Sequence, residues 1–292
     1  MSRHVHLAGI IPIANSNIDY GVNLPVSMLP INEALSVIHK SIIECAVVGC
    51  QTIWIVANDD MAPIIRKTVG DWVYDPVYYS RNQRFSSEVR KEIPIYYVPV
   101  LPKDRDRRDS YGWSVLTGIH AAWFVANKIS KWIVPEKYYV SFPFGLHDIY
   151  DLRSHRKQIS SLKNNFFLTY EDKTVKDNLY LSFTMMAEDF KKCRRHVNSE
   201  TTKTFYNTDD KYPSEKLPLD ERWSARHFNF DTVFQCVDDS NATKIELPWY
   251  HQIDNWYGYR NYLSDENCIE LPNEPLTTPH KHVKLSFTEG EE

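Results

Sequence analysis

The sequence has few cysteines, and their placement excludes the common cysteine-based sites. Five cysteines occur in 292 residues, and no two of them form a Cys-x-x-Cys pair. An odd number of scattered cysteines fits neither a zinc site nor a disulfide framework. We therefore expect reduced thiols. They are Cys45, Cys50, Cys193, Cys236 and Cys268.

The chain also lacks a large net charge and a long apolar run. Its formal net charge is −4 and its isoelectric point is about 6.3. The chain therefore has no excess of positive charge that would attract nucleic acid or an anionic membrane. The opening segment MSRHVHLAGIIPIAN has an apolar run too short to span a bilayer and no basic region followed by a cleavage site. We expect a cytoplasmic protein whose partners include neither nucleic acid nor a membrane.

Two common catalytic signatures are missing as well. The chain has no G-x-x-x-x-G-K-[ST] phosphate loop and no G-x-S-x-G nucleophile motif. Any phosphate or acyl chemistry must therefore use a different arrangement of residues.

Strand and helix patterns alternate over the first half of the chain. We expect strands at residues 4–14, 51–58, 93–100 and 137–142, and helices at residues 32–48, 60–70 and 110–126. Asn32 is the expected N-cap of the first helix, and Gly49 the left-handed residue just past its end. This alternation predicts an α/β fold, a three-layer sandwich with a mostly parallel central sheet.

The second half is less regular. Strands or strand–helix pieces are expected at residues 162–172 and 178–190, a loop at residues 198–220, and strands at residues 227–237 and 243–249. The Pro-rich, acidic stretch 272–292 is expected to be an extended tail. We expect a single domain at residues 1–271, with a nucleotide-binding half at 1–150 and a substrate and metal half at 151–271.

Several segments together resemble a known family, the sugar-phosphate nucleotidyltransferases. LAGIIPIAN, then LPVSMLPIN and EALSVIHKSIIECAVVGCQTIWIVAND, follow the order of that family's N-terminal half: a strand ending in L-A-G-G, a glycine-rich basic loop, K-P-x-x-P, a helix and a strand. Weaker matches are DMAPIIRKTVGD, DSYGWSVLTGIHAA and PWYHQIDNWYGYRNYL. The resemblance covers most of residues 6–150 and one late segment, and it implies the nucleotide-diphospho-sugar transferase fold.

The resemblance also implies site residues. Leu7, Ala8 and Gly9 match the start of the nucleotide-binding segment, and the stretch from Asp109 to Gly112 matches the part that holds the base. Asp254 matches the family's late metal-binding aspartate. Asp148 is the nearest substitute for the other metal ligand, so that the two aspartates would hold Mg²⁺.

Departures from the family fall on the residues that handle phosphate charge. Between Gly9 and Asn32 the chain has one glycine, Gly21, and no Lys or Arg. The family's metal-binding strand ends in Gly-Asp, whereas this one runs into Phe142-Pro143-Phe144-Gly145. Nucleotidyl transfer depends on positioning and on neutralising phosphate charge, so the fold-forming positions are kept while the charge-handling positions are lost.

The chain has two basic segments, and the first is a candidate to replace the lost charge. KDRDRRDSYG, residues 103–112, offers Arg105, Arg107 and Arg108 as phosphate contacts, and we predict them as the catalytic residues. Interleaved aspartates support the alternative of a solvated loop. KKCRRHV, residues 191–197, is either an exposed helix end or an interaction patch.

Two functions of different classes follow. The first is transfer of a nucleoside monophosphate from a nucleoside triphosphate to a sugar phosphate or similar acceptor, with Mg²⁺. The second is a catalytically inactive relative that serves as a structural or protein-interaction subunit, as a homo-oligomer or in a larger assembly; the aromatic run at residues 249–262 would suit such a contact. A third, a glycosyltransferase, would need a D-x-D pair, and DIYD at residues 148–151 has the wrong spacing.

Overall fold

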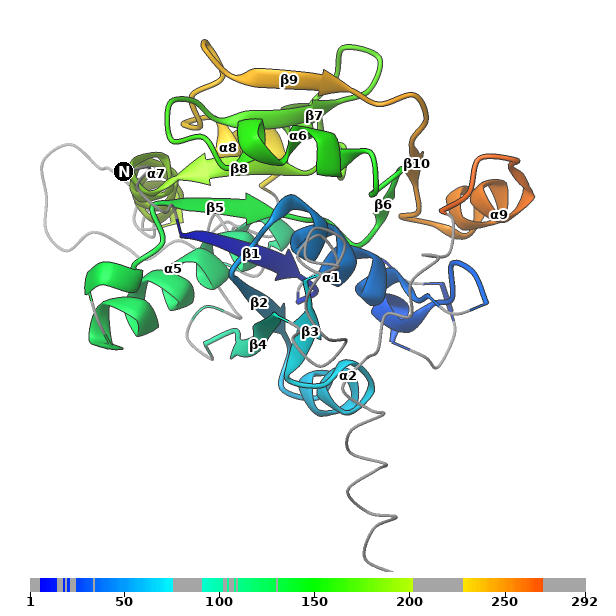
Figure 1. Cartoon of the computed structure of the whole chain (residues 1–292), viewed down its shortest axis with the longest axis horizontal. Coiled ribbons are helices and arrows are strands. Elements are labelled where there is room, and N and C mark those ends of the chain that lie inside the picture. Colours follow the sequence, from blue (N-terminus) through cyan, green and yellow to red (C-terminus); the bar gives the residue numbers. More distant parts are fainter. Residues whose placement is uncertain are drawn as a thin grey trace, which may run out of the picture.

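A central mixed sheet with helices on both faces forms the body of the protein (Figure 1). The computed structural model describes residues 6–14, 18, 20–21, 25–33, 35–75, 91–101, 104, 108, 110–129, 131–201 and 228–269. The expected tail at 272–292 and most of the expected loop at 198–220 lie outside these residues.

The sheet has eight strands in the order β3-β4-β2-β1-β5-β8-β7-β9. Neighbours β4, β2, β1 and β5 run parallel, as do β7 and β9, whereas β3 and β8 pair antiparallel with their neighbours. This topology confirms the predicted α/β class with a mostly parallel sheet. The strands are β1 (Leu7–Pro12), β2 (Thr52–Ala57), β3 (Trp72–Tyr74), β4 (Glu92–Pro99), β5 (Lys137–Val140), β7 (Phe166–Thr169), β8 (Phe183–Met186) and β9 (Thr243–Glu246).

A short separate ladder stands beside the sheet. Strands β6 (Gly145–Leu146) and β10 (His251–Gln252) pair antiparallel, with Leu146 opposite His251 and Gly145 opposite Gln252. The ladder joins the segment after β5 to the late part of the chain.

Helices divide between the two faces and form two apolar cores. One core packs α1, α2, α6 and α9 against the sheet, and the other packs α5, α7 and α8. The helices are α1 (Val37–Val48), α2 (Ala62–Val69), α5 (Tyr111–Ile129), α6 (Leu152–Ile159), α7 (Ala187–Thr201), α8 (Phe230–Phe234) and α9 (Trp256–Ser264). Three 3₁₀ turns are η1 (Val26–Met28), η2 (Lys131–Ile133) and η3 (Val175–Asp177).

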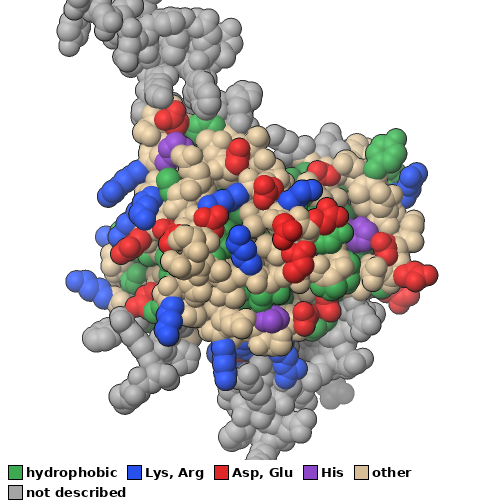
Figure 2. All heavy atoms as spheres, turned by 90° about the horizontal axis from the view of Figure 1, so that it is seen from above, with side chains coloured by type: hydrophobic (Ala, Val, Ile, Leu, Met, Phe, Trp, Pro, Cys, Tyr) green, Lys and Arg blue, Asp and Glu red, His purple; other side chains and the backbone are tan. Residues whose placement is uncertain are grey.

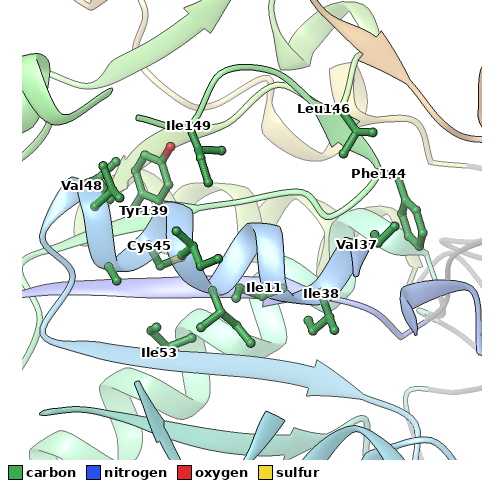
Figure 3. Packing of buried hydrophobic residues seen from close by; sticks show 14 of the residues in the cluster. Ile11, Val37, Ile38, Cys45, Val48, Ile53, Tyr139, Phe144, Leu146 and Ile149 are labelled. Carbon is green, nitrogen blue, oxygen red and sulfur yellow. The ribbon is translucent and has the colours of Figure 1, made fainter. Parts of the chain in front are cut away.

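Helix α1 is the centre of the first core. All its residues except His39 are buried, and Figure 3 shows its side chains packed among those of β1, β2 and β5. The helix begins at Val37, later than the sequence predicted, because the Asn32 side chain instead accepts a bond from the Leu35 amide (2.8 Å) in a preceding turn. It ends as predicted, with Gly49 at φ 97°.

One predicted strand is wrong. Residues 230–234, within the expected strand at 227–237, form helix α8. Phe230, Val233 and Phe234 are buried at helical spacing, and Asn229 is extended at the N-cap position. The high strand propensity of Phe and Val hid this short helical pattern.

None of the helices in the described ranges is long and apolar enough to cross a membrane. On the face shown in Figure 2, acidic and basic side chains are interspersed, so that face carries no broad field of a single sign.

Candidate functional site

The carboxyl ends of β1, β2 and β5 share one edge of the sheet, because these strands are parallel neighbours. Open α/β sheets bind their ligands beyond this edge. It is therefore the first place where the predicted site residues should be sought.

The backbone amides just after β1 are hydrogen-bonded to the neighbouring strand β2. The amides of Ile13 and Ala14 both donate to the Val56 carbonyl, at 2.8 and 2.9 Å. A phosphate-binding loop needs free amide donors at this point, so these two amides do not serve a phosphate.

The three residues predicted to begin the nucleotide site lie earlier, inside the strand. Leu7 and Ala8 are buried, and Gly9 pairs with Ile53 of β2 and Tyr139 of β5. A Cβ on Gly9 would lie 2.8 Å from the Cys45 Sγ atom. The structure gives these residues a packing role, and their contact with a nucleotide stays a prediction that burial does not favour.

Helix α5 begins at the same edge and is tied to the chain after β1. The Tyr111 hydroxyl donates to the Pro12 carbonyl (2.9 Å), and the Ser114 hydroxyl donates to the Ala14 carbonyl (2.8 Å). Gly112 is buried, and a Cβ there would lie 2.9 Å from the Val233 side chain, so it allows α8 to approach α5 closely. Asp109, the other predicted base contact, lies outside the described residues.

Of the three arginines predicted as catalytic, only Arg108 is described; Arg105 and Arg107 are not. The Arg108 guanidinium donates to Asp104 Oδ1 and to Thr201 Oγ1, both at 3.0 Å. It also lies over the Trp113 ring, 5.2 Å from the centroid. Arg108 is thus directed toward the end of α7.

Five aromatic rings fill the space directly beyond β1 and β5. Phe142 and Phe144, where the resemblance expects Gly-Asp, are fully buried. Their rings contact those of Tyr111, Tyr180 and Phe230, with centroid separations between 5.0 and 6.2 Å. We call these five residues the aromatic cluster. It replaces the charged lining expected from the family with an apolar one.

Asp254 lies at the border of the aromatic cluster. The Ile253 amide donates to the Phe144 carbonyl (2.9 Å), which holds the next residue, Asp254, beside the chain that follows β5. The Asp254 carboxylate accepts bonds from Gln252 Nε2 (2.8 Å) and Asn255 Nδ2 (2.7 Å). Its carboxylate is only partly buried, so it can still meet a ligand.

Tyrosines surround Asp254. The Tyr20 hydroxyl donates to the Ile253 carbonyl (2.5 Å), and the Tyr250 hydroxyl lies 3.1 Å from Gln252 Oε1. Burial and, secondarily, the negative charge of Asp254 raise the pKa of Tyr180 to about 12. At neutral pH this phenol is therefore a neutral hydrogen-bonding group.

The ladder does not bring the two predicted metal ligands together. Asp148 follows Leu146 of β6, and Asp254 follows Gln252 of β10. Because the strands are antiparallel, each chain leaves the paired residues toward the opposite end of the ladder. Asp148 Oδ1 instead accepts the Tyr150 amide (2.9 Å).

The described residues hold no group of three or more His, Cys, Asp or Glu side chains that could bind a metal ion. Mg²⁺ can be held by one or two carboxylates plus substrate phosphates. A Mg²⁺ shared by Asp148 and Asp254 stays a prediction that the register of β6 and β10 does not favour, and we derive no step through a metal.

Sequence reasoning missed a buried polar network beneath the aromatic cluster. The Lys40 ammonium contacts Glu44 (2.6 Å), the Phe142 carbonyl (3.4 Å) and His147 Nε2 (3.5 Å). Glu44 also accepts bonds from the hydroxyls of Tyr139, Ser141 and Ser182. The only signal in the sequence was a Lys and a Glu four residues apart in a helix that is otherwise uncharged.

Each charged group in this network has its full set of partners. Lysine has three donors, and here they have three acceptors; the four acceptor positions of the Glu44 carboxylate are also filled. Burial acts to raise the pKa of the Glu44 carboxyl, but the charge of Lys40 and the neighbouring His147 hold it well below its usual range. The network fastens the Phe142–His147 segment to α1, and Lys40 is not free to bind phosphate.

No family model matches this sequence, and no curated protein matches it. Solved structures do match. One is described as a glucose-1-phosphate thymidylyltransferase from Bacillus anthracis in complex with sucrose; it is 8% identical, with a TM-score of 0.55 over 91% of this chain and 98% of that chain. Another is a UDP-glucose pyrophosphorylase complexed with UDP-glucose, 12% identical, with a TM-score of 0.53 over 89% of this chain and 98% of that chain.

At such low identity these matches show the fold alone. They confirm the nucleotide-diphospho-sugar transferase fold that the sequence resemblance implied. At the edge where open α/β sheets bind their ligands, the described residues include the aromatic cluster and the partly exposed Asp254.

Proposed function

We propose that this chain is a nucleotidyltransferase-like protein that binds a nucleotide sugar or sugar phosphate at the carboxyl edge of its sheet. The position of Asp254 carries the proposal. Asp254 follows Ile253, which is bonded to the segment after β5; its charge acts on Tyr180 of the aromatic cluster, and Gln252 and Asn255 donate to its carboxylate. Carboxylate and amide groups bind sugar hydroxyls, and aromatic rings pack against the apolar face of a sugar.

The proposed reaction is transfer of a nucleoside monophosphate from a nucleoside triphosphate to a sugar phosphate or similar acceptor. This transfer needs cations near the phosphates. Among the described residues, Lys40 is held by Glu44, and Arg108 is bonded to Thr201 at the end of α7. Arg105 and Arg107 therefore remain the proposed phosphate contacts, with Asp109 beside the base.

A thermal-shift assay tests the binding step. Nucleoside triphosphates, nucleotide sugars and sugar 1-phosphates at millimolar concentration, with and without Mg²⁺, should raise the melting temperature if they bind the folded chain. Asp254→Asn should abolish that rise, and the matched control Asp148→Asn should keep it. An equal loss in both variants, or no rise with any ligand, contradicts the proposal.

A pyrophosphate-release assay on the same ligands tests the reaction. Release that depends on both the triphosphate and the sugar phosphate, and that Asp254→Asn removes, supports transfer. Ligand binding without release contradicts the reaction and leaves the binding proposal standing.

A second candidate is a catalytically inactive protein of this fold that acts as a structural or interaction subunit. The observation in its favour is the aromatic cluster, because its rings fill the place where a charged substrate would bind. Trp256 and Tyr257 on the outer side of α9 are exposed and would suit a protein contact. A defined homo-oligomer in light scattering, lost on Trp256→Ala and Tyr257→Ala substitution, together with no ligand response, would favour it.

A further inference from the structure

Described residues of the two basic segments noted in the sequence come together in the fold. Arg108 precedes α5, and its side chain reaches Thr201 at the end of α7 (3.0 Å). Arg194 lies seven residues before Thr201, two turns earlier along the same face of α7. Helices α5 and α7 pack on the same core, so the described residues of the first segment, Asp104 and Arg108, lie close to α7.

Arg194 is half-buried and lacks a partner of its own. Among the described residues, no hydrogen bond or ion pair to its guanidinium is formed. Burial lowers the pKa of Arg194; the charge of Asp104 raises it, and that of Arg108 lowers it again. The two arginines are thus close enough for their charges to interact.

One carboxylate serves both guanidinium groups. Asp104 is almost fully buried and is bonded to Arg108 Nη1 (3.0 Å). Within the described part of the chain, these two positive charges share this one negative charge in a partly desolvated place. A buried charge without a partner is costly, and an anion would remove that cost.

Trp113 adds a second unpartnered donor. This residue is 3% exposed, and its ring lies under the Arg108 guanidinium. Its indole Nε1 is buried and finds no acceptor within the described part of the chain. A buried donor of this kind normally has a partner.

We propose that Arg108 and Arg194 form an anion site that takes the phosphate group of a small phosphorylated ligand. The planar guanidinium presents paired N–H donors that match two phosphate oxygens. The site lies between α5 and α7, whereas Asp254 follows β10, so it is separate from the proposed sugar site. It therefore goes beyond the function proposed above.

Calorimetric titration of the full chain tests the site, with inorganic phosphate and pyrophosphate as probes at constant ionic strength. Arg194→Gln should weaken binding by about tenfold or more, the loss expected for a charge-assisted hydrogen bond. The matched control is Arg195→Gln, which removes the same charge from the exposed neighbour and should change affinity by less than about threefold. Adenosine monophosphate in a parallel titration shows whether free phosphate or the phosphate of a nucleotide binds more tightly.

A second variant guards against a folding defect. Trp113→Phe keeps an aromatic ring under Arg108 and removes the indole donor, so binding should weaken while the circular dichroism spectrum is kept. Its smaller ring leaves space in the core and lowers the melting temperature, so binding is measured well below that temperature. No saturable binding of either probe overturns the proposal. Binding of a single-stranded oligonucleotide is titrated as well. If Arg194→Gln and Arg195→Gln weaken the binding of either probe or of the oligonucleotide equally, the proposal is also overturned, because the binding then reflects a diffuse basic surface.

The test is independent of the sugar site. Arg194→Gln should leave the melting-temperature response to nucleotide sugars intact, and Asp254→Asn should leave phosphate binding intact. Failure of one site therefore does not imply failure of the other.

Discussion

The Lys40 Nζ atom lies 2.6 Å from Glu44 Oε2, one helical turn away, and neither side chain is exposed to solvent. Lys40 also bonds to the Phe142 carbonyl, directly beneath the aromatic cluster. Besides packing in the core, the ion pair therefore holds the segment that carries Phe142, Phe144 and His147 against α1. The position of this segment at the carboxyl edge of the sheet depends on the ion pair.

Breaking this pair should destabilise the fold strongly. Glu44→Leu or Lys40→Met leaves the other charge buried without a counter-ion, which costs about 3–5 kcal/mol. The double variant Lys40→Met/Glu44→Leu removes both charges and should lose less than either single variant. Urea unfolding followed by circular dichroism measures the three free energies, and a double variant as unstable as the sum of the singles would contradict this account.

Lys137 predicts a pH dependence of stability. Burial lowers the pKa of Lys137 from 10.5 to about 8, although bonds to the Ser161 and Asn164 carbonyls (2.6 and 2.8 Å) favour its charged form. Between pH 8 and 10.5 the unfolded chain binds more protons at this lysine than the folded chain, so its contribution to stability rises with pH.

The comparison variant for this prediction is Lys137→Met. The free energy of unfolding of the unmodified chain minus that of Lys137→Met should increase over this range, by up to about 3 kcal/mol. Taking the difference cancels the tyrosines, which also titrate there. A flat or falling difference would show that the two carbonyl bonds outweigh burial.

Substituting two glycines with positive φ distinguishes the cost of backbone strain from the cost of a steric clash. Gly49 has φ +97°, and a Cβ there would lie 2.3 Å from Arg156 Nε; Gly21 has φ +66°, and a Cβ there would meet no atom of the described residues within 4 Å. Gly21→Ala should cost about 1–2 kcal/mol, from the left-handed backbone alone. Gly49→Ala should cost more, because it also displaces Arg156 from Asp75 (3.2 Å). Equal losses in thermal unfolding would count against the Arg156 contact.

The order of strands and helices could be predicted from the sequence because it depends on local signals. Alternating apolar runs indicated β1, β2, β4 and β5, and Gly49 marked the end of α1. Short elements were harder: in α8 the residues Phe230, Val233 and Phe234 fit either a strand or a single helical turn.

The site could be predicted far less well, because it depends on contacts between distant residues. Glu44 bonds to Tyr139 and Ser182, which are 95 and 138 residues away. Whether Asp148 and Asp254 meet depends on the register of β6 and β10, which are only two residues long. The resemblance placed the nucleotide loop at Gly9, but pairing with β2 continues β1 to Pro12.

Gly9 offers a direct test of packing against ligand binding. A Cβ at Gly9 would lie 2.8 Å from Cys45 Sγ and 3.2 Å from Cys50 Sγ, and both thiols are buried. Gly9→Ala should therefore cost about 1–3 kcal/mol through overpacking. Cys45→Ala opens space at the nearest atom, so Gly9→Ala/Cys45→Ala should be more stable than the sum of the two single losses predicts.

The Gly9→Ala/Cys50→Ala variant is the control, since its sulfur is farther from the new methyl group and the recovery should be smaller. The rescued Gly9→Ala/Cys45→Ala variant then decides the role of Gly9. If Gly9 only packs against α1, the melting-temperature response to nucleotides should match that of Cys45→Ala. If the response is lost while stability is restored, Gly9 contributes to the nucleotide site, and β1 must shift when the ligand binds, because in this structure Gly9 is enclosed by β2, β5 and the two thiols.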